Sequence, residues 1–133
     1  RLAQFSLDTR RRLRLVETAR GSVGNSVDLG GNWFGDLDTH REILRVIMED
    51  DSVDLVAANT VDLNPSLGFT RAMLDISSHY RKPIAVSCSG SFVDKDRMTQ
   101  LEKSRIPIYF LPEKVITGLA GLVRYGEILK AIG

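Results

Sequence analysis

The stretch "SVDLVAAN", residues 52–59, decides the fold class. From Val53 to Ala58 it is apolar on both faces, apart from Asp54 at its start. A strand with one face in water alternates apolar and polar residues, whereas a strand of a parallel sheet is covered on both faces and is apolar throughout. The stretch therefore predicts a doubly buried strand of a parallel sheet, which ends at Asn59.

Further strands are expected at regular intervals along the chain. "IAVSCSG" (residues 84–90) and "IYFL" (108–111) each follow a proline, and "SVDLGG" (26–31) predicts one more strand. Helical patterns separate them, and we expect helices over residues 6–21, 37–51, 64–82 and 94–104, with a last helix that Pro112 opens. Alternating strands and helices build a parallel sheet with helices on both faces. The sequence predicts a single α/β domain over residues 1–133, a three-layer, flavodoxin-like, doubly wound parallel sheet.

Local signals refine these helices. Asp8 and Asp38 are the expected N-caps of the first two, and Glu42 falls where a capping box places its acid. The expected buried stripe of the second helix consists of Ile43, Leu44, Val46 and Ile47. The last helix carries apolar residues at helical spacing, namely Val115, Ile116, Leu119, Leu122, Val123, Ile128 and Leu129.

Composition excludes several classes of protein. The 133 residues hold 43% hydrophobic side chains, enough for a core, and a net charge of +1, which argues against a nucleic-acid partner. A single cysteine, Cys88, cannot make an internal disulfide, or a metal site by itself, and this favours a cytoplasmic location. No apolar run reaches the roughly 18 residues of a membrane span, so no membrane is expected. Because the chain begins at Arg1, directly before a helical pattern, we expect a piece of a longer polypeptide.

The carboxyl ends of the expected strands are small and polar, and ligands bind at such ends in open α/β sheets. Together with nearby helix N-termini they suit an anion such as phosphate. The candidate contacts are Gly30, Gly31, Asn59, Thr60, Ser89, Gly90 and Ser91. Plain turn chemistry explains the same residues, and both interpretations stay open.

No complete catalytic group is present, and no dinucleotide or P-loop fingerprint occurs. His40 is expected at a helix surface or cap, and His79 at a helix C-terminus. Cys88 is expected to pack at a strand end. Trp33 and Phe34 fall outside the periodic pattern and are expected to cover a neighbouring domain. We expect no catalytic residue and no metal ligand here, and a site that other domains complete.

The order of several short motifs resembles a known family. "GNSVDLGG", "DDSVDLVAANTV", "KPIAVSCSG" and "LEKSRIPIYFLPEKVITGLAGLVRYGE" resemble, in order and spacing, the last flavodoxin-like domain of the nucleotide-diphosphate-forming acyl-CoA synthetases, relatives of succinyl-CoA synthetase. The matching positions are Asn25, Val27, Asp28, Gly30, Asp50, Asp51, Val53, Asp54, Lys82, Pro83, Leu101, Ile106, Pro107, Pro112, Leu119, Leu122 and Tyr125. Within the first motif Asn25 and Asp28 are expected to hold a turn.

The resemblance implies a ligase that makes acyl-CoA through an acyl phosphate and a phosphohistidine carried by another domain. The full enzyme would use ATP or ADP, Mg and CoA, none of them bound by this domain alone, with CoA-binding and ATP-grasp domains as partners. This domain would help to form the phosphohistidine site. Ser26 replaces the family's proline, and Val61 and Asp62 replace a glycine pair. These departures leave open a non-catalytic regulatory or ligand-sensing domain, as in a protein acyltransferase, and a free-standing binding module.

Overall fold

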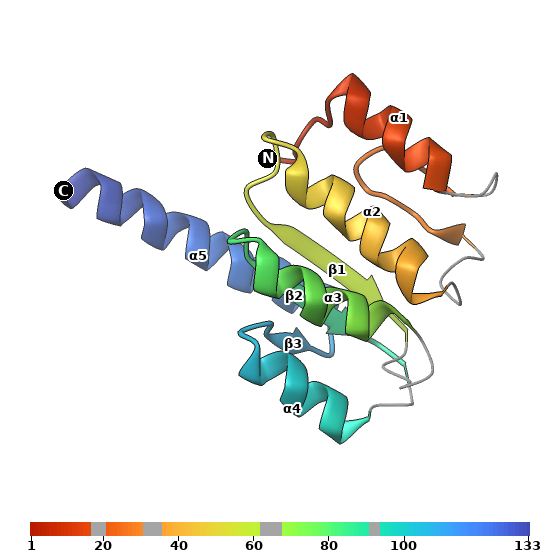
Figure 1. Cartoon of the computed structure of the whole chain (residues 1–133). Coiled ribbons are helices and arrows are strands. Elements are labelled where there is room, and N and C mark those ends of the chain that lie inside the picture. The colour runs from red at the N-terminus through yellow and green to blue at the C-terminus, as the bar shows by residue number, and fades with distance from the viewer. Residues whose placement is uncertain (17–20, 31–35, 62–67, 91–93) are drawn as a thin grey trace.

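The computed structural model describes residues 1–16, 21–30, 36–61, 68–90 and 94–133 (Figure 1). Its elements in chain order are α1 (Leu7–Val16), α2 (Leu37–Glu49), β1 (Val56–Thr60), α3 (Gly68–His79), β2 (Ile84–Cys88), α4 (Lys95–Lys103), β3 (Ile108–Tyr109) and α5 (Pro112–Ile132). The predicted class is confirmed: this is a three-layer α/β fold of the flavodoxin-like type.

The described sheet has three parallel strands in the order β1-β2-β3. All five residues of β2 are buried, as predicted for a central strand. The prediction of burial on both faces was wrong for β1, where Ala57 and Asn59 are exposed. The reason is its position, because α5 packs over Ala85 of the neighbouring strand and leaves this face of β1 open.

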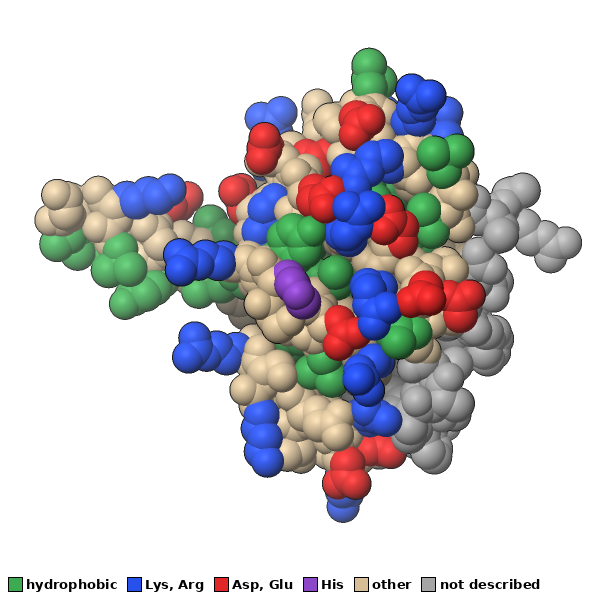
Figure 2. Space-filling view, in the orientation of Figure 1, with side chains coloured by type: hydrophobic (Ala, Val, Ile, Leu, Met, Phe, Trp, Pro, Cys, Tyr) green, Lys and Arg blue, Asp and Glu red, His purple; other side chains and the backbone are tan. Residues whose placement is uncertain are grey.

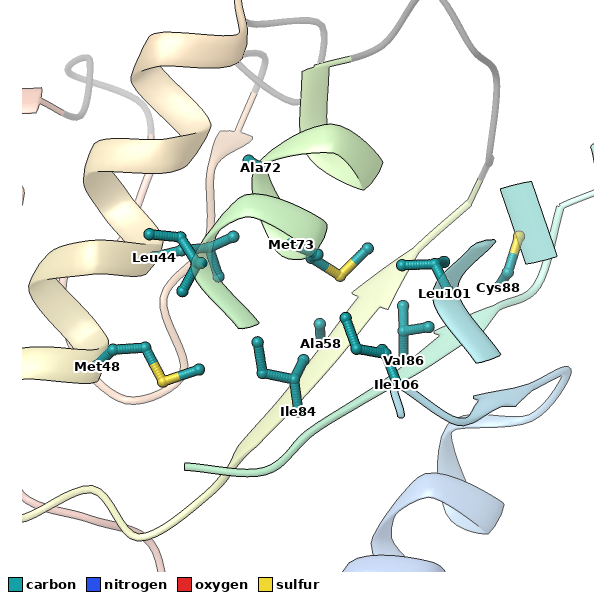
Figure 3. Packing of buried hydrophobic residues seen from close by; sticks show 11 residues of the cluster. Leu44, Met48, Ala58, Ala72, Met73, Ile84, Val86, Cys88, Leu101 and Ile106 are labelled. Carbon is teal, nitrogen blue, oxygen red and sulfur yellow. The ribbon is translucent and has the colours of Figure 1, made fainter. Parts of the chain in front are cut away.

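Alternate residues of β2 separate the two sides of the sheet. Ile84, Val86 and Cys88 join the main core, where they meet side chains of α2, α3 and α4 (Figure 3). Ala85 points to the opposite face and packs with Val115 of α5. Helices therefore cover both faces of the sheet, which is the arrangement that the strand–helix order predicts.

Residues 26–30, the described part of the strand predicted over 26–31, do not belong to the sheet, contrary to prediction. Asp28 instead forms an isolated antiparallel bridge with Ser22, in which each backbone N–H donates over 2.9 Å to the other carbonyl. The Asp28 carboxylate also accepts a hydrogen bond from the Gly30 N–H at 2.8 Å. Such local bonds compete with a sheet ladder. Val27 and Leu29 pack against the cluster between α1 and α2.

Both expected N-caps were wrong by two residues. Ser6 caps α1 by accepting the Thr9 N–H at 3.1 Å, and Asp36 caps α2 by accepting the Thr39 N–H at 2.8 Å. A cap side chain reaches the N–H three residues ahead, so the acids at Asp8 and Asp38 lie inside the first turn instead. There they complement the positive end of the helix dipole.

Glu42 and His40 also depart from expectation. Glu42 forms no capping box, and its carboxylate pairs with Arg45 on the next turn. His40 is 1% exposed, and its ring meets Phe69 of α3 edge-on, with ring centroids 5.5 Å apart. The cause is that α2 is covered on two sides, by α1 and by α3 with the sheet, so its buried surface is wider than the predicted stripe. Within that stripe, Ile47 is only half-buried.

The helix α5 is buried only where it crosses the sheet, at Val115 and Leu119. Its second half projects away from the rest of the molecule (Figure 1). Large apolar side chains are exposed along α5, mostly in this second half, namely Ile116, Leu122, Val123, Tyr125, Ile128, Leu129 and Ile132. None of the helices in the described part of the chain combines the length and the apolar character required to cross a bilayer.

Asp50, at the end of α2, is a buried carboxylate that joins three segments. It accepts hydrogen bonds from the N–H groups of Ser6 and Ser52, at 2.9 and 2.8 Å, and one from the Thr9 hydroxyl. Burial by itself raises the pKa of Asp50, but these hydrogen bonds outweigh it and hold the pKa well below its usual value. The Lys82 ammonium group donates a hydrogen bond to the backbone carbonyl oxygen of Asp50, with Nζ and the oxygen 2.7 Å apart. This lysine therefore has a structural role here.

Candidate functional site

The candidate site lies at the edge of the sheet where the strands end. The helix α3 follows β1 and α4 follows β2, so both begin at this edge, and α2 begins there too (Figure 1). The starts of α2 and α3 are in contact, since a Cβ on Gly68 would lie 2.6 Å from the backbone N and Cα of Leu37. Only glycine allows the two backbones to approach so closely. Three helix N-termini thus face the same edge.

Four of the predicted contact residues come together at this edge. Asn59 and Thr60 end β1, and Ser89 and Gly90 follow the end of β2. The parallel register brings Thr60 beside Cys88, and the Ser89 N–H donates to the Thr60 carbonyl at 3.2 Å. Parallel pairing places the carboxyl ends of both strands at the same edge of the sheet, which brings these residues together.

The glycine at position 90 is required by a backbone contact. A Cβ added there would lie 1.4 Å from the Val61 carbonyl oxygen. The Ser89 N–H is already used by the Thr60 carbonyl. The two strand ends therefore satisfy part of each other's hydrogen bonding, and Gly90 is explained by this packing without any ligand.

Asn59 is the side chain best placed to meet a ligand. It is exposed on β1, on the face of the sheet where α5 lies. The buried hydroxyl of Ser87 donates to its carboxamide oxygen at 2.7 Å. This bond fixes the amide orientation, so that the nitrogen, with two protons to donate, is directed away from Ser87.

Ser87 itself was not singled out from the sequence as a supporting residue. The available signal is a polar residue inside an apolar strand, since a buried hydroxyl needs a partner and the neighbouring strand offers one. The register pairs Asn59 with Ser87, so the partner is the adjacent side chain.

Acidic side chains oppose an anion at this edge, since Asp38 and Asp96 lie in the first turns of α2 and α4 and two further carboxylates cap these helices. Asp36 caps α2 and Asp94 caps α4, where its side chain accepts the Arg97 N–H at 2.9 Å. The hydrogen bond from the Thr39 N–H lowers the pKa of Asp36. The Asp36 carboxylate is therefore charged at neutral pH. These side chains use N–H groups that an anion would bind and add negative charge. The described start of α3 carries no acidic residue in its first turn.

The remaining predicted residues divide into two groups. Gly30 is turned toward the α1–α2 side, because its N–H is held by Asp28 and its neighbour Leu29 packs there. Asn25 donates its side-chain N–H to the Ala3 carbonyl at 3.1 Å. Gly31, Trp33, Phe34, Asp62 and Ser91 lie outside the described residues.

The histidines and the cysteine bring no further chemistry to this edge. His79 lies in the last turn of α3, with Nδ1 2.8 Å from the Asp75 carbonyl oxygen. Cys88 is buried in the main core, as expected for a strand end. Within the described ranges, no cluster of three His, Cys, Asp or Glu side chains is arranged to hold a metal.

Comparison with known proteins shows the fold. The chain is similar to the crystal structure of PH0766 from Pyrococcus horikoshii OT3, with a TM-score of 0.71 and 21% identity. The similarity covers 86% of this chain and 27% of that chain, so the chain spans about a quarter of the length of the structure that it matches. No family model matches the chain, and no curated protein is found to be related to it.

Proposed function

We propose that this chain is one domain of a nucleotide-diphosphate-forming acyl-CoA synthetase and contacts the phosphorylated group that another domain presents. The observation that carries the proposal is that β1 ends, with Asn59 and Thr60, at the edge of the sheet where α3 begins. The motif order described above supports the family, and the flavodoxin-like fold is the one that this family's domain requires. The CoA-binding and ATP-grasp parts belong to other domains.

In this proposal the domain stabilises charge and transfers no proton. The amide nitrogen of Asn59, oriented by Ser87, donates to a phosphoryl oxygen. The described start of α3 lies at the same edge on the other face of the sheet and has no acid in its first turn, so its helix dipole also favours an anion there. Preorganised donors of this kind stabilise developing negative charge without a nucleophile or base. The Gly90 contact keeps the two strand ends together beneath the ligand.

The decisive experiment measures acyl-CoA formation by the full polypeptide that contains this chain, with ATP, Mg, CoA and a panel of carboxylic acids. We expect ADP release that depends on both CoA and one acid. Asn59→Ala is expected to lower kcat about tenfold, the effect of one lost hydrogen bond to a charged group. Gln100→Ala, an exposed amide on α4, is the control and keeps full activity. Normal activity of the Asn59→Ala enzyme would show that this edge of the sheet takes no part in the reaction.

Neutralising the two cap carboxylates tests whether the edge accepts phosphate. Asparagine also caps helices well, so Asp36→Asn with Asp94→Asn is expected to change the free energy of unfolding by less than about 1 kcal/mol. Loss of two repelling charges is expected to tighten binding of inorganic phosphate several-fold, as measured by calorimetry. Asp51→Asn with Asp54→Asn, which removes two charges from exposed residues beyond the end of α2, is the control and leaves affinity unchanged. Equal binding by all three proteins would argue against an anion at this edge.

A second candidate function is a regulatory or ligand-sensing domain without ligation. The specific observation in its favour is that Asp36 and Asp94 occupy helix N-termini at the edge and that the Ser89 N–H is bonded to Thr60. In that case the full polypeptide forms no acyl-CoA from any acid, whereas a CoA ester or a nucleotide raises its melting temperature. Acyl-CoA synthesis would exclude this candidate.

A further inference from the structure

The second half of α5 carries a continuous apolar seam that the described part of the chain leaves exposed. Spacings of three and four residues, the heptad pattern of helices that pack side by side, connect Val115, Gly118, Leu122, Tyr125, Leu129 and Ile132. The first two pack within the chain, since Val115 is buried and a Cβ on Gly118 would lie 2.6 Å from the Tyr109 hydroxyl. The last four are between 46% and 79% exposed.

Figure 2 shows apolar side chains gathered along one edge of the projecting helix, with charged ones elsewhere on it. In the heptad pattern the charged residues of this half, Arg124, Glu127 and Lys130, fall outside the seam and its flanks. The flanks hold Gly126 and Ile128. Flanking charges normally select a partner of opposite charge, so their absence means that two identical seams meet without repulsion.

The glycines of α5 permit a close approach. A Cβ added to Gly121 or Gly126 would meet nothing within 4 Å among the described residues, so packing against these residues requires neither glycine. A glycine inside a helix costs about 1 kcal/mol relative to alanine. Beside an apolar seam, a missing side chain lets a second helix lie close to the backbone. Such packing would offset the lower helix propensity of the glycines.

We propose that the seam of α5 packs against the same seam of a second copy of this chain, in antiparallel orientation, over residues 122–132. A parallel pair is excluded by geometry, because the sheet covers the first half of the seam and two sheets would compete for the space between the helices. In the antiparallel pair the two sheets lie at opposite ends of the paired segment and do not compete for space. Tyr125 then meets Leu129 of the partner subunit, and Leu122 meets Ile132 of the partner subunit.

The size of the seam sets the expected affinity. Four large side chains, each about half exposed or more, offer several hundred Å² per copy, below the roughly 800 Å² that each partner contributes to a standard interface. We therefore expect a dimer that forms in the micromolar range, by a two-fold symmetric contact. This inference does not depend on the proposed function.

Sedimentation of the 133-residue chain from about 1 to 500 μM tests the proposal. We expect the mass to rise from that of the 14.8 kDa monomer to that of a dimer and to stop there. Leu129→Glu is expected to weaken the dimer at least tenfold, and Leu122→Ala, which keeps helix propensity, to weaken it several-fold. Ala131→Glu, the same charge on an exposed residue outside the seam, is the control and leaves the dimer intact.

Disulfide trapping tests the orientation. Leu122→Cys and Ile132→Cys proteins are expected to cross-link when mixed, and neither is expected to do so alone, because in the antiparallel pair each position faces the other. The native Cys88 is buried and does not interfere. Three results would overturn the proposal. They are a chain that stays monomeric up to 500 μM, a dimer whose affinity Leu129→Glu does not change, and assemblies larger than a dimer. Cross-linking of either single variant alone would overturn the antiparallel arrangement.

Discussion

Replacing Asp50 by asparagine is expected to lower the free energy of unfolding by about 3 kcal/mol at pH 7, because a buried carboxylate with several donors loses part of its acceptor capacity. Asp50 is 6% exposed and accepts N–H groups from Ser6 and Ser52. The introduced amide group would place its own N–H protons against one of these donors. Urea denaturation at pH 7 measures the loss.

The effect of Asp50→Asn depends on pH in a defined direction. Hydrogen bonding lowers the pKa of Asp50 in the folded protein below the value of about 3.9 that it has in an unfolded chain. The stabilisation is therefore complete above about pH 4 and is lost as the pH falls from there toward the folded-state pKa. We expect the difference between the two proteins to shrink steadily as the pH falls below 4.

The neighbouring acid provides a matched control. Asp51 is exposed, and Asp51→Asn makes the same chemical change one residue away, so its cost is expected to stay within about 0.5 kcal/mol. A loss for Asp50→Asn that is equally small at pH 7, or that does not change between pH 7 and pH 3, would show that this carboxylate does not hold the three segments together.

Replacing Gly90 by alanine is expected to cost about 3 kcal/mol through overpacking at the strand ends. The added Cβ would lie 1.4 Å from the Val61 carbonyl oxygen, so the two backbones must separate. The same movement breaks the bond from the Ser89 N–H to the Thr60 carbonyl. We expect a lower urea midpoint and faster hydrogen exchange at the Ser89 amide.

Gly24→Ala is the control for this substitution. A Cβ on Gly24 would lie 3.6 Å from the Ser22 hydroxyl oxygen, an ordinary contact, so its effect is expected to stay within about 0.5 kcal/mol. If Gly90→Ala proves as stable as the unchanged protein, with the Ser89 amide still protected, the close approach of the strand ends is not a constraint on this position.

Periodicity predicted the fold better than it predicted its boundaries. The runs around β2 and α4 were placed within a few residues, because a buried strand and a capped helix have strong local signals. Residues 26–31 were assigned to the sheet because they are apolar at their centre, yet Val27 and Leu29 serve a different cluster. The local pattern of apolar residues predicts that a segment is buried. It does not predict against which element the segment packs.

The candidate site was predictable to the extent that it depends on chain direction. Parallel pairing brings Thr60 and Ser89 together, and the sequence contains that information. The N-cap role of Asp36, the orienting bond from Ser87 and the hydrogen bonds of Asp50 depend on which side chains meet after folding. Long-range contacts of this kind have no signature at fixed spacing along the chain.

The position of α2 between two hydrophobic clusters has a consequence for how the molecule opens. On one side it contributes Leu44 and Met48 to the main core, and on the other Ile43 and Val46 to a cluster with α1. Among the described residues, none that is fully buried belongs to both clusters, and Val56 of β1 is a half-buried side chain that packs against both. We therefore expect α1 and the segment around Val27 to unfold locally more readily than the sheet, which hydrogen exchange would detect.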